Sequence, residues 1–207
     1  MRGEQDSLNR RVPGRDLNLM ARTPRQIEDE HLALRCRLGE PGAFAELVET
    51  MERPLLYFAR SIVHNDEAAL DVLQAVWITA FRGLRRLDEP AALRSWLYRV
   101  TRGHAIDHVR RDVARASAER SLAEEAVDVE NPHEEPLFDA EDAARLHRCL
   151  ATLDVRHREV LVLHFLEDMP LNQVATVVGC PPGTVKSRIY HAKRALKEAL
   201  LRQSHDT

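Results

Sequence analysis

Residues 171–194 read LNQVATVV (171–178), GCPPG (179–183) and TVKSRIYHAKR (184–194), two segments of helical periodicity around a glycine-containing turn. Val174 and Val178 give the first segment a buried face, and Val185 and Ile189 anchor the second at i, i+4 spacing. Gly179 permits the sharp turn that sets two helices at a steep angle. The stretch therefore predicts a helix-turn-helix.

The second of these helices carries polar and basic side chains on its outward face. They are Lys186, Ser187, Tyr190, His191, Lys193 and Arg194. A helix with small residues at its N-terminus and basic flanks can enter a DNA major groove, where its free N–H groups favour phosphate. The alternative interpretation is a structural helical hairpin with a solvated basic face.

Upstream of this stretch, apolar residues also recur at helical spacing, and no segment favours a β-strand. The predicted fold class is all-α, with two small helical domains, a bundle and a helix-turn-helix, joined by an acidic flexible linker. The expected division is a flexible N-terminal arm at 1–26, a first domain at 27–115, the linker at 116–139 and a second domain at 140–203.

The helix expected to start at Asp66, with Asn65 as its cap, has two different faces. Its large apolar residues predict a buried face of Leu70, Leu73, Trp77, Phe81 and Leu84. The opposite face presents a stripe at i, i+3, i+7 that suits a protein partner, formed by Asp71, Gln74 and Ile78. The alternative is an ordinary solvated helix face.

The next helix, expected over 90–115 with Asp88 as its cap, combines aromatic residues with cations. Aromatic rings and cations on one element suit stacking and phosphate contact with single-stranded DNA. Trp96 lies in phase with Leu93 and Val100, which favours a place for its indole in the core.

The formal net charge of −3 hides a segregation of charge along the chain. Residues 81–115 hold nine basic and four acidic residues, and residues 183–202 hold six basic and one acidic. Between them, residues 116–142 hold one basic and ten acidic residues. Two basic segments around an acidic one are typical of a nucleic-acid binder. We also hypothesise that the acidic linker shields the basic faces in the free protein.

Composition removes several classes of protein. No stretch approaches the ~18–20 uncharged residues that span a bilayer, and the first 26 residues lack the apolar core of a secretory signal. Three widely spaced cysteines exclude a disulfide framework and a Cys-x-x-Cys site, so a cytoplasmic location is expected.

Candidate catalytic and metal sites are weak. The sequence shows no convergent acid, base and nucleophile and no phosphate-binding glycine loop, so we expect no enzyme and no cofactor. His104 with His108, and His147 with Cys149, lack an evident third metal ligand. The acidic pair Glu167-Asp168 is expected to be solvated.

The 171–194 stretch resembles region 4 of the bacterial sigma-70 family, in its extracytoplasmic-function (ECF) group. REVL (158–161) and GTVKSR (183–188) are typical of that group, and the first domain resembles region 2 at AFAELV (43–48), DVLQ (71–74), RSWLYRV (94–100) and DHVRR (107–111). The resemblance implies a sigma factor that binds core RNA polymerase and directs initiation at −10 and −35 promoter elements. The implied partners are the β′ clamp and β flap of the polymerase, promoter DNA, and an anti-sigma factor.

The resemblance also implies roles for individual residues. Core polymerase would be bound by Asp71, Gln74 and Ile78. The −10 element would be contacted by Arg94, Trp96, Tyr98, Arg99, Arg102, His104, Asp107, His108, Arg110 and Arg111. The −35 element would be contacted by Gly183, Thr184, Lys186, Ser187, Arg188, Tyr190, His191, Lys193 and Arg194.

Four positions depart from the group's usual pattern. Leu70 and Ala75 stand where acidic residues flank the core-binding pair, Gly103 replaces an Asn, and His191 replaces an Arg. Histidine is shorter and largely neutral at pH 7, so we expect weaker guanine contact at position 191. Gly103 lacks the hydrogen-bonding side chain of Asn, so we expect an unusual −10 preference. A helix-turn-helix repressor would explain the C-terminal domain but neither the Asp71 stripe nor the Trp96 helix.

Overall fold

The computed structural model describes residues 23–63, 65–120 and 140–203, and every regular element in these ranges is helical. The main helices are α1 (Pro24–Leu38), α2 (Ala43–Val63), α3 (Asp66–Gly83), α4 (Leu93–Arg120), α5 (Ala140–Ala151), α6 (Val155–Leu161), α7 (Leu171–Val178) and α8 (Pro182–Gln203). Short turns of other helix types are η2 (Leu84–Arg86), η3 (Pro90–Ala92) and the π-helical η4 (Val162–Leu166). Within the described ranges, no helix has the length and apolarity that a bilayer crossing requires.

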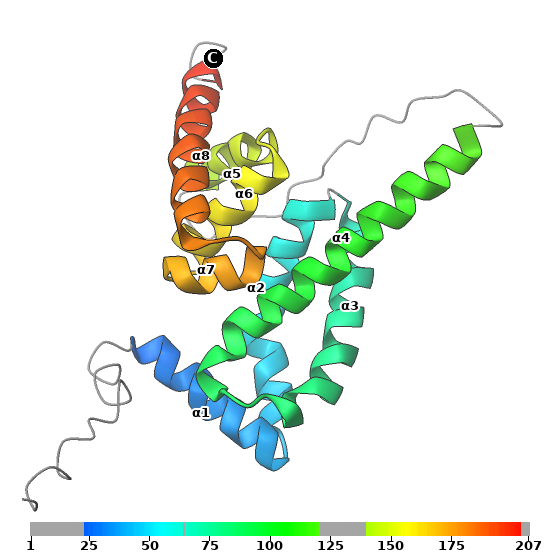
Figure 1. Ribbon diagram of the computed structural model, residues 1–207, viewed down its shortest axis with the longest axis vertical. Coiled ribbons are helices and arrows are strands. Elements are labelled where there is room, and N and C mark those ends of the chain that lie inside the picture. Colours follow the sequence, from blue (N-terminus) through cyan, green and yellow to red (C-terminus); the bar gives the residue numbers. More distant parts are fainter. Residues whose placement is uncertain (1–22, 64, 121–139, 204–207) are drawn as a thin grey trace, which may run out of the picture.

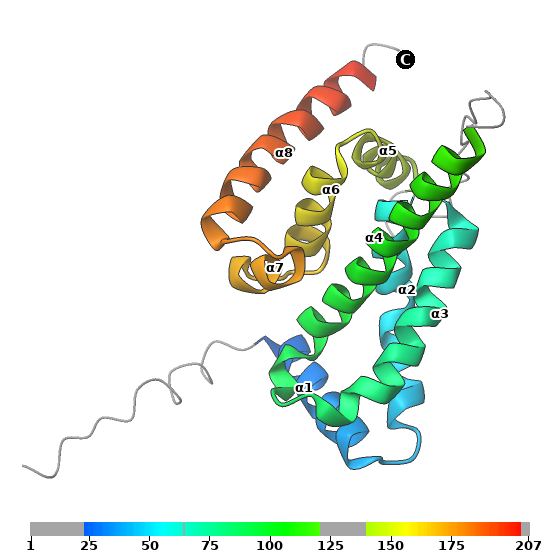
Figure 2. The same ribbon diagram turned by 45° about the vertical axis from the view of Figure 1, so that its right-hand side comes forward.

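Helices α2, α3 and α4 pack side by side, and α1 crosses the end of the bundle where α4 begins (Figure 1, Figure 2). The apolar stripe of α2 supplies the centre of this core through Leu47, Met51, Leu55 and Phe58, all at most 1% exposed. Phe58 meets Tyr98 of α4 edge to face, with ring centroids 5.2 Å apart. This geometry is a favourable one for aromatic pairs, and it fixes the rotation of α4 against α2.

Helices α5 to α8 form a second packed unit, in which α7 and α8 are the predicted helix-turn-helix (Figure 2). Val174, Val178, Val185 and Ile189 are all buried, as expected from their spacing. Gly179 ends α7 with a φ of +70°, a backbone conformation that favours glycine. The all-α fold and the helix-turn-helix are therefore confirmed.

The two units contact each other directly. Helix α4 lies against α7, and α2 contacts α6, so the N-terminal half of α4 is covered on two sides (Figure 1). The C-terminal half of α4 extends past α7 and α3 (Figure 1). This asymmetry along one helix determines which of its side chains are accessible.

Two helix starts differ from the expected ones. Helix α1 begins at Pro24, before the expected Ile27, because Thr23 caps it and Gln26 completes a capping box. Asp88 does not cap α4, because the chain first makes the 3₁₀ turn η3, whose N-cap Glu89 has no side-chain bond to the turn. By contrast, Asn65 and Asp154 cap α3 and α6 as expected.

At its other end α4 continues to Arg120, beyond the expected end at residue 115. Residues 109–115, the last part of the expected helix, are exposed, so α4 already lacks a buried apolar face there and continues past residue 115 without the periodicity whose loss suggested a linker. Residues 1–22 of the expected arm at 1–26 and residues 121–139 of the expected linker lie outside the described residues, as does the shielding hypothesis that depends on that linker.

The predicted buried face of α3 is wrong at two positions. Leu70 and Phe81 are 53% and 66% exposed, whereas small and β-branched residues are buried instead, namely Ala69, Val72, Val76 and Ala80. Small side chains let α3 approach α2 and α4 closely, so the face that packs is not the face with the largest apolar residues. Leu73 and Leu84 are buried as expected.

Candidate nucleic-acid interface

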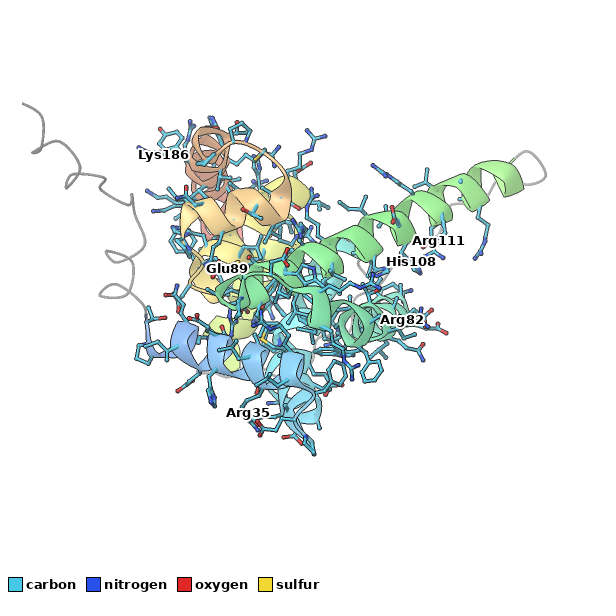
Figure 3. The ribbon with its side chains drawn as sticks, turned by 60° about the horizontal axis from the view of Figure 1, so that its bottom comes forward. Arg35, Arg82, Glu89, His108, Arg111 and Lys186 are labelled. Carbon is cyan, nitrogen blue, oxygen red and sulfur yellow. The ribbon has the colours of Figure 1, made fainter. Side chains whose placement is uncertain are left out.

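The outer face of α8 presents the residues that were expected there. Val185, Ile189 and Ala192 turn inward, which leaves the rest of the helix surface in solvent. The exposed members of the predicted −35 set are Gly183, Lys186, Ser187, Tyr190, His191, Lys193 and Arg194, while Thr184 and Arg188 are half-buried. Lys186 stands on the outer side of this unit (Figure 3). A helix exposed along its basic face has the shape and charge to dock in a DNA groove.

Arg188 points partly inward, toward a buried carboxylate. Its Nη1 lies 3.6 Å from Oε1 of Glu159, whose side chain is 1% exposed. Glu159 also accepts a hydrogen bond from Nε of Arg102 at 2.6 Å. One acidic side chain of α6 thus touches an arginine of α8 and an arginine of α4.

Helix α4 divides its ten predicted −10 residues by depth. Arg99, Asp107, Arg110 and Arg111 are exposed, while Trp96, Arg102, His104 and His108 are half-buried. His108 and Arg111 lie on the part of α4 that extends away from α7 (Figure 3). The other two, Arg94 and Tyr98, are buried.

The burial of Arg94 and Tyr98 corrects the expectation that both contact DNA. Nε and Nη2 of Arg94 donate to the two oxygens of Asp29 at 2.7 and 3.2 Å, and its Nη1 donates to Glu167 at 3.0 Å. Tyr98 is 0% exposed against Phe58. Both positions face the junction of α1, α2 and the second unit, which no periodicity along α4 alone could reveal.

Glu167 is buried, not solvated as expected. Besides Arg94, its carboxylate accepts a hydrogen bond from Nη2 of Arg25 at 3.3 Å. Burial raises the pKa of Glu167 above its ordinary value, and the neighbouring arginines only partly offset this effect. The adjacent Asp168 is exposed, at a φ of +53°. Only tertiary packing separates the environments of these two neighbours.

Trp96 packs against the backbone of a glycine. A Cβ added at Gly83 would come within 2.8 Å of the indole, closer than real atoms approach. Gly83 therefore makes room for the ring at the junction of α3 and α4. The in-phase spacing with Leu93 and Val100 had favoured this packed position.

A groove of about 350 Å³ runs between α3 and α4. Asp71 and Gln74 line it from α3, and His104, His108, Arg111 and Arg115 line it from α4. His104 is also hydrogen-bonded to Thr79 of α3 at 3.0 Å. The structure thus brings part of the predicted polymerase-binding set beside part of the predicted −10 set.

The charged groups along this groove are two arginines, Arg111 and Arg115, and two carboxylates, Asp71 and Asp112, and its two histidines could have suggested a metal. In the part of the chain that the structure describes, no three His, Cys, Asp or Glu side chains converge on a point where a metal ion could bind.

The outer face of α3 is more apolar than the sequence pattern had suggested. Leu70, Ile78 and Phe81 are all about half exposed or more, at 53%, 49% and 66%, and they flank the exposed Asp71 and Gln74. Phe81 rests on Phe44 of α2, with ring centroids 5.3 Å apart. The i, i+4, i+8, i+11 spacing of Leu70, Gln74, Ile78 and Phe81 could have identified this stripe.

A second apolar surface lies beside the helix-turn-helix and was missed. Phe165 of η4 is 49% exposed, and Nζ of Lys193 lies 5.7 Å from its ring centroid. Phe165 belongs to the apolar run VLVLHFL (160–166), which periodicity assigns to the core as a whole. The π-helical turn rotates the end of that run out of register, so Phe165 faces solvent.

Comparisons with known proteins follow the same two units. Family models match twice: Sigma-70 region 2 over residues 47–115, and Sigma-70, region 4 over residues 143–196. The RNA polymerase sigma-H factor of Pseudomonas aeruginosa is 33% identical over 184 residues, covering 84% of this chain and 95% of that protein. The ECF RNA polymerase sigma-E factor of Escherichia coli is 26% identical over 182 residues, covering 83% and 93%.

Solved structures agree with this fold. A structure of CnrH in complex with the cytosolic domain of CnrY matches with a TM-score of 0.60 at 26% identity, covering 83% of this chain and 96% of that one. The sigma factor RpoE of Bartonella quintana, in complex with the anti-sigma factor NepR, matches with a TM-score of 0.65 at 21% identity, covering 77% and 97%. The chain therefore belongs to the sigma-70 family, in its ECF group, as a sigma factor that binds core RNA polymerase and directs transcription initiation at promoters.

Proposed function

We propose that this sigma factor works through three surfaces: the outer stripe of α3 for core polymerase, the exposed side of α4 for the −10 element, and the outer face of α8 for the −35 element. The surfaces would belong to a first domain, expected at 27–115 and extended by α1 to Pro24 and by α4 to Arg120, and to a second domain at 140–203, with an arm before the first and a linker between the two. The observation that carries the proposal is the exposed apolar and polar stripe on α3, which a DNA-binding repressor would not need.

The α3 stripe is Leu70, Asp71, Gln74, Ile78 and Phe81. Contiguous exposed apolar side chains around polar ones are typical of a protein-docking site. We assign it to the β′ clamp, with Asp71, Gln74 and Ile78 as its centre. Leu70, where the group has an acidic residue, makes the apolar part of the contact larger.

The −10 surface would consist of the exposed and half-buried residues of α4, without Arg94 and Tyr98. Its members are Trp96, Arg99, Arg102, His104, Asp107, His108, Arg110 and Arg111. Cations on a protruding helix attract the phosphate backbone, and half-buried aromatic and imidazole rings offer stacking surfaces for unpaired bases. Gly103 is exposed with no atom within 4 Å of an added Cβ, so it contributes no side-chain contact of its own.

The −35 surface would be the outer face of α8, from Gly183 to Arg194. Lys186, Ser187 and His191 would reach base edges, while Lys193 and Arg194 would contact phosphates. The apolar surface at Phe165 would receive the β flap. We further propose a cytoplasmic, non-catalytic factor that an anti-sigma partner can bind.

In vitro transcription with purified core polymerase and a fragmented genomic template tests the proposal. We expect start sites that appear only when the protein is added, with shared upstream sequences. Ile78→Arg should lower core binding and transcription together, whereas Glu52→Arg on the exposed side of α2 should change neither. Retained DNA binding with no new start site and no core binding would instead support the repressor.

A further inference from the structure

Lysine is confined to a single helix of this chain. Of the 30 Lys and Arg residues, three are lysines, and they are Lys186, Lys193 and Lys197. All three lie on α8, whereas every cationic position of α3 and α4 other than histidine is an arginine. The side-chain amines of the chain are therefore gathered on the helix that carries the predicted −35 residues.

Lysine and arginine respond differently to activated carboxyl groups. The lysine amine is a nucleophile once it loses a proton, whereas the arginine guanidinium stays protonated in proteins. An acyl phosphate or an acyl thioester can therefore transfer its acyl group to Nζ of a lysine. The new N–C bond forms as the C–O or C–S bond of the donor breaks, phosphate or thiol leaves, and the amine proton passes to solvent. The product is an uncharged amide.

The three amines are open to such a donor. Lys186, Lys193 and Lys197 are all exposed, and Lys186 stands on the outer side of its unit (Figure 3). None of them forms an ion pair with a residue that the structure describes. The ring of Phe165 approaches Lys193 at 5.7 Å and covers one side of its amine at most. No buried carboxylate holds these side chains, in contrast to the guanidinium group of Arg94.

Two of the three amines lie within the proposed −35 surface. Lys186 would reach a base edge and Lys193 a phosphate, whereas Lys197 lies beyond Arg194, the last residue of that surface. An acyl group on Lys186 or Lys193 removes the positive charge on which the contact depends, and it makes the side chain bulkier. Loss of a base contact and a phosphate contact should weaken promoter binding about tenfold or more.

We propose that Lys186 and Lys193 are acylation sites, and that transfer of an acyl group to them from an acyl phosphate or an acyl thioester prevents −35 recognition without affecting the α3 and α4 surfaces. This inference rests on the proposed −35 role of α8. The acylated factor keeps the whole α3 stripe, so it still binds core polymerase. It therefore occupies the polymerase without placing it at a −35 element.

The test treats the purified full-length chain with acetyl phosphate, and in a parallel reaction with acetyl-coenzyme A. Peptide mass spectrometry maps the acetyl groups, and we expect them at Lys186 and Lys193. After the donor is removed, the protein is mixed with untreated core polymerase. Fluorescence anisotropy should then show about tenfold weaker binding of this complex to promoter DNA, while the affinity for core polymerase should not change.

Two variants serve as controls, each compared with itself before and after treatment. The triple variant Lys186→Arg/Lys193→Arg/Lys197→Arg keeps every charge but has no side-chain amine, so treatment should leave its promoter affinity unchanged. It retains the α-amine of the chain, so it also reports any effect of acetylation there. The double variant Lys186→Arg/Lys193→Arg keeps only Lys197, and acetylation of that residue should not weaken promoter binding. Circular dichroism verifies that the treated proteins remain folded.

The outcomes distinguish the inference from the proposed function. Absence of acetyl groups from Lys186 and Lys193 with both donors, or acetylation there without loss of promoter affinity, would overturn the inference. An equal loss of affinity in the treated triple variant would overturn it too, because that loss would arise outside the lysines of α8. Failure of the untreated wild type to direct transcription with core polymerase would instead contradict the proposed function, whatever the mass spectra show.

Discussion

Helices α4 and α8 are both basic, and both were expected to contact DNA, yet they present their residues very differently. On α8, seven of the nine predicted residues are exposed and none is buried. On α4, four of ten are exposed, four are half-buried, and Arg94 and Tyr98 are in the core. The predicted DNA-binding residues of α4 are thus far less accessible than those of α8.

The difference comes from the number of neighbours each helix has. Helix α8 packs with one side on α5, α6 and α7, so a single apolar stripe separates inside from outside. Helix α4 contacts α1, α2, α3 and α7, so its N-terminal half is covered from several directions. A basic residue on a surface helix is a fair candidate for DNA contact, whereas one on a central helix is as often an ion-pair partner.

The comparison is tested most strongly at Tyr98 and its exposed neighbour Arg99. Tyr98→Ala should lower the free energy of unfolding by about 3–5 kcal/mol, because it leaves a cavity against Phe58. Arg99→Ala should change it by no more than about 0.5 kcal/mol. Urea denaturation of both variants measures the contrast, and similar values for the two would contradict the burial of Tyr98.

Two glycines, Gly83 beside α4 and Gly103 within it, sharpen the same contrast. Gly83→Ala should destabilise by about 1–3 kcal/mol, because the new methyl group would meet the Trp96 ring at 2.8 Å. Gly103→Ala should stabilise by about 0.5–1 kcal/mol, because that glycine lies inside an exposed helical turn with open space around it. Thermal melts should shift in opposite directions, and a common direction would refute this description of the α3–α4 junction.

On the exposed face of α8, a substitution should change DNA binding without changing the stability of the fold. Lys186→Ala removes an exposed cation, so promoter affinity should fall by about 1 kcal/mol while the unfolding midpoint stays constant. Fluorescence anisotropy measures the effect, and because Lys186 is assigned to a base edge, the loss of affinity should be larger on promoter DNA than on DNA of unrelated sequence. An unchanged affinity would remove Lys186 from the interface.

The smallest effect concerns pH and Glu167. Burial raises the pKa of this carboxyl in the folded chain, so the fold favours the protonated form. The stabilisation from protonated Glu167 is therefore complete below the ordinary pKa of 4.5, and it declines as the pH rises through the pKa of the folded chain. Glu167→Gln keeps the shape of the protonated form. From pH 4 to pH 7, wild type should therefore lose stability relative to this variant. Denaturant titrations of both proteins at pH 4 and pH 7 measure the difference in their free energies of unfolding. An equal difference at the two pH values would contradict this prediction.

The local sequence by itself determined the helical segments, the turn at Gly179, the caps at Asn65 and Asp154, and the outer face of α8. Each depends on interactions within a few residues or on a single apolar stripe, so chain neighbours carry the information. The resemblance of short motifs to sigma regions 2 and 4 was enough to identify the family, and the family-model matches confirmed it.

Only the tertiary structure decided which face of α3 is buried, that Arg94, Tyr98 and Glu167 lie inside, and that Arg102 and Arg188 share Glu159. Close packing of Ala69, Val76 and Ala80 outweighs the larger residues Leu70 and Phe81, because small side chains let helices approach. The ion pairs of Arg94 with Asp29 and Glu167, and of Arg102 with Glu159, join residues 57 to 73 positions apart, so no local pattern could pair them. The sequence does not show whether a charged side chain is solvated by water or paired with a distant carboxylate, because only the fold brings that carboxylate within reach.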